Sequence, residues 1–216
     1  MSQTPLIEGK KISFRYGDEV VFRDFSFQIN EGDRVVLKGD SGSGKTTLFR
    51  LILGFEKLQQ GDITFRGESI KGNPEIIKRL RKNSSWLPQD LNIGTGSVTD
   101  VILFPFTFQA HKEKRPNRSG IEEILKSFGL LPDEVLEKPF ADLSTGQRQR
   151  IGLSLCILLD QPFILLDEPT SALDLDSKKR AAKQLLDQPE KTVLSTSHDP
   201  FWVERCDTVI DLNKGK

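Results

Sequence analysis

The stretch Gly39-Asp40-Ser41-Gly42-Ser43-Gly44-Lys45-Thr46 matches the pattern G-x-x-x-x-G-K-[ST]. A short β-branched run, residues 34–38, precedes it and predicts a strand, and residues 45–54 predict a helix. In this context the glycines let backbone N–H groups surround a phosphate, and the helix start adds the positive end of its dipole. The alternative is a flexible glycine turn before a helix. We predict a phosphate-binding loop.

Two side chains of this loop indicate that its ligand is a nucleotide with Mg²⁺. Lys45 can reach the β- and γ-phosphates of a nucleotide, and the Thr46 hydroxyl can bind Mg²⁺. Asp40 brings a negative charge near the loop, and we expect it to point outward. The candidate nucleotide-binding residues here are Gly39, Asp40, Ser41, Gly42, Ser43, Gly44, Lys45, Thr46 and Thr47.

An acidic pair follows a second apolar run further along the chain. Residues 163–166 read as a buried parallel strand, and Asp167 and Glu168 come directly after it. Ligands bind at the carboxyl ends of such strands. We expect Asp167 to hold Mg²⁺ through water and Glu168 to act as general base on an attacking water. Alone, the pair also fits an ordinary strand followed by a helix cap.

Hydrophobic periodicity divides the chain into three regions. Residues 6–30 alternate between apolar and polar and predict antiparallel strands, whereas beyond residue 142 helices alternate with strands, which predicts a parallel sheet. Residues 90–142 carry little strand signal and predict an inserted helical subdomain, in which Ser97 and Asp100 cap a helix that Pro105 disturbs. The predicted fold is a single α/β domain over residues 1–216, with a mainly parallel sheet and an N-terminal antiparallel β subdomain.

Composition excludes several classes of protein. The 31 basic and 31 acidic side chains give a net charge of zero, which does not favour a mainly electrostatic partner, and no nucleic acid is expected. Cys156 and Cys206 have neither metal-ligand nor redox spacing. The longest near-apolar stretch, residues 151–159, is far shorter than the about 20 residues of a spanning helix. Residues 1–10 do not resemble a signal peptide, so we expect a cytoplasmic protein.

The segment Leu143-Ser144-Thr145-Gly146-Gln147 has an ordinary explanation by itself, because Ser144 and Gln147 form a capping box before an amphipathic helix. In company with the other motifs it resembles the signature of the ATP-binding cassette (ABC) ATPases, and the resemblance covers nearly the whole chain. The residues that carry it, in the order of the family, are Tyr16, the phosphate loop, Gln89, 143–147, Asp167-Glu168, Ser171-Ala172-Leu173-Asp174 and His198.

The resemblance implies a role for each of these residues. It makes Tyr16 the aromatic that stacks on adenine, Gln89 the link from Mg²⁺ and the attacking water to the helical subdomain, and His198 the switch histidine on the γ-phosphate. It makes Asp174 a contact with an opposite subunit. Each residue also has an ordinary explanation: a core or surface tyrosine, a solvent-facing glutamine, and caps at helix starts.

The same resemblance implies a P-loop core of the ABC ATPase fold that binds and hydrolyses ATP with Mg²⁺. In the family, the signature of one subunit caps the nucleotide of the other, so Ser144, Gly146 and Gln147 would complete a head-to-tail homodimer in the ATP-bound state. Thr145 departs from the family, which has a glycine there. We expect a negative φ at Thr145, with Gly146 keeping the close approach to phosphate.

Within the family we expect the ATPase subunit of a transporter. It would act on a separate transmembrane permease, which would hold it at the cytoplasmic face of the membrane. The phenylalanines of residues 104–108 are either a docking groove for that partner or the core of the helical subdomain. The chain also resembles the small ATPases paired with iron-export-type permeases. The alternatives are a soluble ABC ATPase in assembly or repair, and a nucleotide-gated scaffold.

Overall fold

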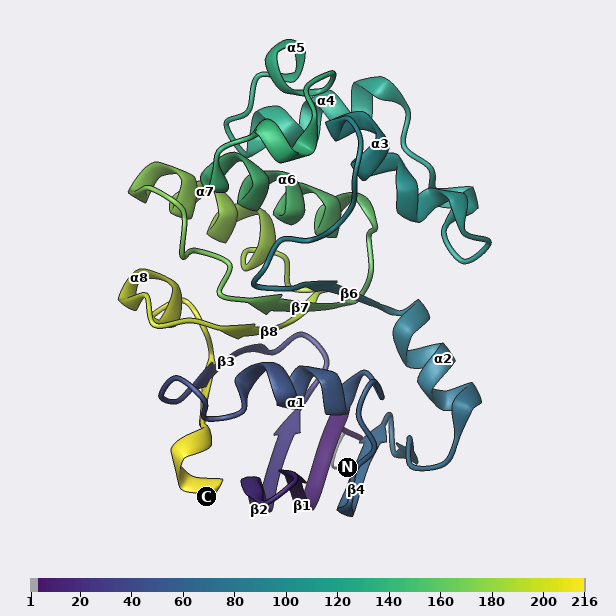
Figure 1. Ribbon diagram of the computed structural model, residues 1–216, viewed down its shortest axis with the longest axis vertical. Helices are drawn as coiled ribbons and strands as arrows, with labels where there is room; N and C mark the ends of the chain where they lie inside the picture. The colour runs from purple at the N-terminus through teal and green to yellow at the C-terminus, as the bar shows by residue number, and fades with distance from the viewer. Residues whose placement is uncertain (1–3, 216) are drawn as a thin grey trace.

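The computed structural model describes residues 4–215, which fold around two β-sheets with helix α1 (Lys45–Ile52) between them (Figure 1). The larger sheet has five parallel strands in the order β6-β7-β8-β3-β9. Their bounds are β3 (Arg34–Lys38), β6 (Ser84–Leu87), β7 (Phe163–Asp167), β8 (Thr192–Thr196) and β9 (Thr208–Asp211). All residues of β7 and β8 are buried, which explains the continuous apolar run at residues 163–166 of β7.

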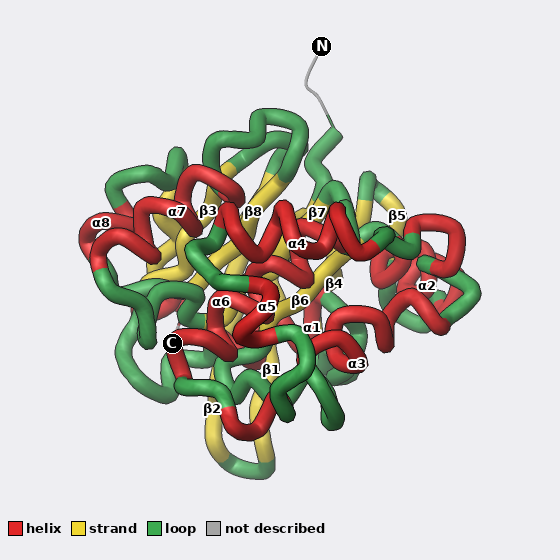
Figure 2. Tube along the Cα trace, turned by 90° about the horizontal axis from the view of Figure 1, so that it is seen from above, coloured by secondary structure: helices red, strands yellow, loops and turns green. Residues whose placement is uncertain are grey.

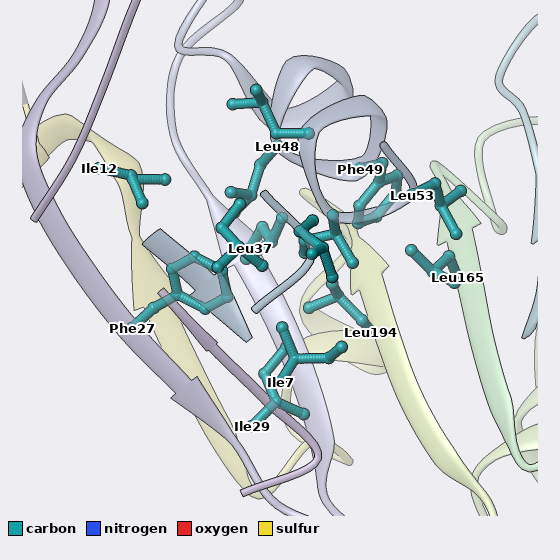
Figure 3. Packing of buried hydrophobic residues seen from close by; sticks show 14 of the residues in the cluster. Ile7, Ile12, Phe27, Ile29, Leu37, Leu48, Phe49, Leu53, Leu165 and Leu194 are labelled. Carbon is teal, nitrogen blue, oxygen red and sulfur yellow. The ribbon is translucent and has the colours of Figure 1, made fainter. Parts of the chain in front are cut away.

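The second sheet is antiparallel, with the order β2-β1-β4-β5. Its strands are β1 (Ile7–Tyr16), β2 (Glu19–Ile29), β4 (Gln60–Phe65) and β5 (Glu68–Ser69). The predicted antiparallel region is therefore present. Side chains of α1 fill the space between the two sheets: Leu48 and Phe49 lie among Ile12 of β1, Leu165 of β7 and Leu194 of β8 (Figure 3).

A helical region lies beyond the parallel sheet, on the side away from the antiparallel sheet (Figures 1 and 2). Its elements are α3 (Val98–Leu103), η1 (Phe104–Thr107), η2 (Lys112–Lys114), α4 (Arg118–Ser127), α5 (Pro132–Val135) and η3 (Phe140–Asp142). Of these, α3, α4, α5 and η3 share a hydrophobic cluster. The long helix α6 (Thr145–Leu158) joins both layers, because Ile151 packs in this cluster while Leu153 and Cys156 pack in the cluster beneath, beside the parallel sheet.

The remaining helices flank the parallel sheet. They are α2 (Pro74–Lys82), α7 (Leu175–Leu185), α8 (Pro200–Val203) and the 3-10 turn η4 (Leu212–Gly215). Helix α2 was not expected, although Asn73 and Pro74 carry its start signal: the Asn73 side chain accepts from the Ile76 N–H, and Pro74 occupies the first turn. Over residues 4–215, no helix combines the length and the apolar character that crossing a membrane requires.

The phenylalanines of residues 104–108 have two explanations, as core of the helical subdomain or as a docking groove, and the structure buries one phenylalanine and exposes two. The predicted disturbance at Pro105 is real, since α3 ends at Leu103 and continues as the 3-10 turn η1. This turn buries Phe106, which is 1% exposed. It leaves Phe104 and Phe108 about half exposed, with their rings in edge contact at 5.2 Å between centroids.

Candidate functional site

The loop between β3 and α1 has the backbone that a phosphate cradle needs. Gly42 and Gly44 adopt φ values of 75° and 96°, in the left-handed region that favours glycine. At Gly44 a side chain would also collide with β2, because a Cβ built there lies 2.5 Å from Val21 Cγ1 and 2.9 Å from Phe22 Cζ. The glycine at this position is therefore required by both the backbone and the packing.

Two polar side chains of the loop, those of Ser43 and Lys45, are directed inward. The Lys45 ammonium donates to the carbonyl oxygens of Gly39, at 2.7 Å, and Asp40, at 3.1 Å. Ser43 Oγ is buried and has no hydrogen-bond partner, which suits a loop built to take an anion. Asp40 is exposed, as expected from the sequence.

The acidic pair lies directly behind this loop, at the carboxyl end of β7. Asp167 is 2% exposed, and its Oδ2 accepts a hydrogen bond of 2.6 Å from the Thr46 hydroxyl. A hydroxyl and a carboxylate side by side are oxygen ligands of the kind Mg²⁺ prefers, together with phosphate oxygens. Thr46 and Asp167 are thus residues that could hold Mg²⁺ together with phosphate oxygens, although residues 4–215 contain no group of three or more His, Cys, Asp or Glu suited to a metal.

Glu168 follows in an unusual backbone conformation, with φ at 51°. Its side chain is 15% exposed, and Oε1 lies 3.7 Å from Nε2 of His198, whose side chain is 62% exposed. Burial raises the pKa of the Glu168 carboxyl above its ordinary value, against the lowering effects of His198 and Lys45, and Asp167 raises it further. A carboxylate with a raised pKa is a stronger base, as proton abstraction from water requires.

These groups surround an open cleft of about 520 Å³. It brings together predicted residues from five parts of the sequence, namely Tyr16, Ser41 to Thr47, Gln89, the pair Asp167-Glu168, and His198. Gly39 and Asp40 do not line it. The cleft also includes Glu19, Val21 and Ser171. Neither Glu19 nor Val21 has a motif of its own, and only the position of β2 beside the loop reveals them.

Tyr16 forms one wall of the cleft at the end of β1. It is 44% exposed, its ring makes an edge contact with Phe14 at 4.8 Å, and its hydroxyl donates to Glu56 Oε1 at 3.3 Å. Gln89 is exposed on the other side, just after the end of β6. Both residues are therefore available to a ligand in the cleft.

Ser144, Gly146 and Gln147 do not line this cleft. They form the start of α6, where the predicted capping box is present: the Gln147 N–H donates to Ser144 Oγ at 3.2 Å, and the Ser144 N–H donates to Gln147 Oε1 at 3.0 Å. Thr145 has no positive φ, as expected. A Cβ at Gly146 would lie 2.9 Å from the Ala172 carbonyl oxygen, so glycine allows α6 to approach the loop that follows the acidic pair.

Asp174 has the ordinary role that its position offers. Its carboxylate caps α7 by accepting from the Ser177 N–H at 2.7 Å, and hydrogen bonds from Ser177 lower the pKa of the Asp174 carboxyl. A contact with an opposite subunit remains a prediction for this residue.

A glycine-rich loop and an acidic strand end at the carboxyl edge of a parallel sheet define a phosphate-loop nucleotide-binding protein. A family model described as ABC transporter matches residues 22–171, more than half of the chain. The chain belongs to the ABC transporter family, as one of its ATP-binding cassettes, and is an ABC-type ATPase. The predicted family, fold class and class of enzyme are confirmed.

Several known proteins share this cassette. The lactococcin-G-processing and transport ATP-binding protein LagD of Lactococcus lactis is 32% identical over 95% of this chain and 29% of its own length. The ATP-dependent lipid A-core flippase of Haemophilus influenzae (strain 86-028NP) is 30% identical over 97% of this chain and 36% of its own length. The chain thus spans about a third of the length of these curated relatives.

Solved structures share the fold. A bacterial Atm1-family ABC exporter with ATP bound superposes with a TM-score of 0.84 at 23% identity, over 100% of this chain and 38% of that one. The dimeric MJ0796 cassette, in a post-hydrolysis state with ADP and Pi, gives a TM-score of 0.80 at 24% identity, over 95% of this chain and 93% of that one.

Proposed function

We propose that this chain binds and hydrolyses ATP with Mg²⁺ and thereby drives a transmembrane permease. The observation that carries the proposal is the single cleft in which the phosphate loop meets Asp167, Glu168 and His198. In this arrangement Lys45 and the loop N–H groups hold the β- and γ-phosphates, and Tyr16 takes the adenine. Catalysis of phosphoryl transfer needs mainly positioning and charge neutralisation, which these groups supply.

The hydrolytic step depends on residues at the ends of β6, β7 and β8. Thr46 and Asp167 would hold Mg²⁺, which supplies charge neutralisation on the phosphates when bound. Gln89 would link the metal and the attacking water to the helical region. Glu168 accepts a proton from the water, and His198 donates to the γ-phosphate. The separation of 3.7 Å between Glu168 Oε1 and His198 Nε2 allows both side chains to approach one reacting group.

Exchange of Glu168 for glutamine tests this assignment. Glu168→Gln keeps the shape of the side chain and removes the base, so ATP binding should persist while phosphate release falls about 10²–10⁴-fold. Glu190→Gln, an exposed residue in the loop between α7 and β8, is the matched control. A turnover number of Glu168→Gln within about threefold of the unsubstituted protein contradicts the assignment.

We also propose that ATP joins two copies of the chain head to tail. Ser144, Gly146 and Gln147 lie at the start of α6 and do not line the cleft of their own chain, and a helix N-terminus favours an anion. The MJ0796 cassette, which shares the fold, is dimeric in its solved structures, and this supports the proposed arrangement. Glu168→Gln with ATP and Mg²⁺ should elute as a dimer in size-exclusion chromatography. If the variant remains a monomer there, and crosslinking in the presence of the permease also yields only monomers, the proposed dimer is contradicted.

We further propose that the permease is a separate chain. The relatives named as transport proteins support a membrane partner, and the name of one of them, an ATP-binding/permease protein, combines the two functions in one protein. Such a partner would hold the chain at the cytoplasmic face of the membrane. Copurification of a membrane protein from the native host tests this. A protein that dimerises with ATP but releases no phosphate would instead be a nucleotide-gated scaffold.

A further inference from the structure

Thr196 lies at the end of β8, behind the acidic pair and out of reach of the cleft. It is fully buried, and in the sheet it stands between Leu37 of β3 and Asp167 of β7. A buried hydroxyl is unfavourable unless it is hydrogen-bonded. The Thr196 hydroxyl uses both its donor and an acceptor position: it donates to Asp167 Oδ1 at 2.8 Å and accepts from the Glu168 N–H at 2.8 Å.

The first of these bonds fixes the Asp167 carboxylate. Oδ1 is held by Thr196 and Oδ2 by Thr46, at 2.6 Å, so each oxygen has its own hydroxyl donor. The carboxylate cannot rotate without breaking one of the two bonds. Oδ2 therefore stays directed toward Thr46 and the phosphate loop, on the side where Mg²⁺ would lie.

The second bond fixes the backbone of Glu168. A residue other than glycine with φ at 51° is held in a sparsely populated conformation, which persists only where the surroundings impose it. The Thr196 hydroxyl accepts from the Glu168 N–H, and the Glu168 carbonyl oxygen accepts from the Ser171 hydroxyl at 3.1 Å. The peptide groups on both sides of the Glu168 Cα are thereby held, and its side chain lies near His198.

We propose that Thr196 is a positioning residue that orients both the Mg²⁺-holding and the proton-accepting carboxylate from behind. The proposal rests on the proposed function, since it concerns the same reaction. It predicts that a loss of this hydroxyl acts on Mg²⁺ and on turnover more than on the binding of the nucleotide itself. A hydroxyl that only satisfies buried hydrogen bonds would change stability alone.

Thr196→Val removes the hydroxyl with little change of shape, and Thr196→Ser restores it. The same strand offers a matched control in Thr192→Val. Thr192 is 3% exposed at the opposite end of β8, where its hydroxyl accepts from the Gly32 N–H at 2.9 Å. Each valine variant loses a buried hydroxyl of β8, but only the Thr196 hydroxyl contacts the acidic pair.

The binding readout is titration of the 216-residue chain with a fluorescent ATP analogue, in Mg²⁺ and in EDTA. We expect Thr196→Val to keep its affinity in EDTA and to need about 10- to 100-fold more Mg²⁺ for the same gain in affinity. The turnover number for ATP should fall by a comparable factor, with KM changed less. Thr196→Ser should recover to within about threefold, and Thr192→Val should match the unsubstituted protein in both assays.

Equal Mg²⁺ dependence and turnover in Thr196→Val and Thr192→Val overturn the proposal. If the valine variant fails to fold, as judged by circular dichroism, Thr196→Ala against Thr192→Ala makes the same comparison, and failure of Thr196→Ser to rescue overturns it as well. An unsubstituted protein that binds the analogue without any response to Mg²⁺ contradicts the proposed function instead, so the two failures are distinguishable.

Discussion

The Thr46 hydroxyl donates a hydrogen bond of 2.6 Å to Oδ2 of Asp167, although 121 positions separate the two residues. The bond joins the first turn of α1 to the end of β7, across the boundary between a glycine loop and a buried strand. Bringing these two side chains together requires β8 to pair with β3 on one side and with β7 on the other. The cleft therefore depends on the pairing of strands that are far apart in the sequence.

Asp167→Asn tests the importance of this pair for Mg²⁺. The amide replaces one of the two carboxylate oxygens by an NH₂ donor, so Thr46 and Thr196 can no longer each donate to an oxygen of its own, and the negative charge is lost. The Mg²⁺-dependent gain in nucleotide affinity should fall about 10- to 100-fold, with affinity in EDTA unchanged. Titration with a fluorescent ATP analogue measures both quantities, and an undiminished response to Mg²⁺ would disprove the role.

Glu168→Gln should also change stability in a pH-dependent way. Because the folded protein raises the pKa of Glu168, the folded state retains this proton more strongly than the unfolded chain. The free energy of unfolding therefore falls as pH rises above the ordinary value of 4.5 and through the raised pKa. Glutamine does not titrate, so the variant should melt higher than the unsubstituted protein at pH 7, with the difference shrinking toward pH 4.

Melting curves followed by circular dichroism over this pH range measure the effect. Glu190→Gln provides the control, because it makes the same exchange at an exposed carboxylate outside the cleft. A Glu168→Gln advantage that is the same at pH 4 and pH 7 would show that burial of the charge is not its cause.

Variants of Ser144 separate capping from phosphate binding. Ser144→Ala removes the cap of α6 and should lower the free energy of unfolding by about 1 kcal/mol. Ser144→Asp supplies an equally good cap but places a negative charge where a partner's phosphate would bind. The aspartate variant should therefore keep its stability and lose ATP-driven dimerisation. Chemical denaturation and size-exclusion chromatography measure the two effects, and a dimer of Ser144→Asp would argue that phosphate does not approach this end of α6.

The phenylalanines of η1 and its flanks should separate folding from partner binding. Phe106→Ala empties a fully buried site and should lower the free energy of unfolding by about 3–5 kcal/mol. Phe108→Ser exchanges a half-exposed ring and should change it by at most about 0.5 kcal/mol. Urea denaturation compares the two. If Phe108→Ser destabilises as strongly as Phe106→Ala, the exposed ring pair belongs to the core and not to a docking surface.

Sequence patterns predict those parts of the structure in which only one residue or one class of residue fits. Only glycine fits the backbone and the packing at Gly44, and only an apolar run suits a strand buried on both faces such as β7, so both leave a clear pattern. The capping box at Ser144 and Gln147 is equally visible because its partners are close in sequence. These local signals identify the sheet, the loop and the acidic pair.

Groups that act through the register of the sheet leave no such pattern. Thr196 reads as one more β-branched residue in a strand, and its two hydrogen bonds exist only because β7 and β8 place it opposite Asp167. Val21 likewise joins the cleft only because β2 passes beside Gly44. The division of the segment 104–108 depends on a single 3-10 turn after Pro105, which periodicity does not specify.

Helix α6 has a consequence for how this molecule comes apart. Ile151 belongs to the hydrophobic cluster of the helical region, and Leu153 and Cys156 belong to the cluster beside the parallel sheet. Neither cluster can lose its structure without stripping apolar contacts from the other, since one rigid element supplies both. Denaturation of the two layers should therefore be a single cooperative event, with coincident transitions for probes placed in either layer.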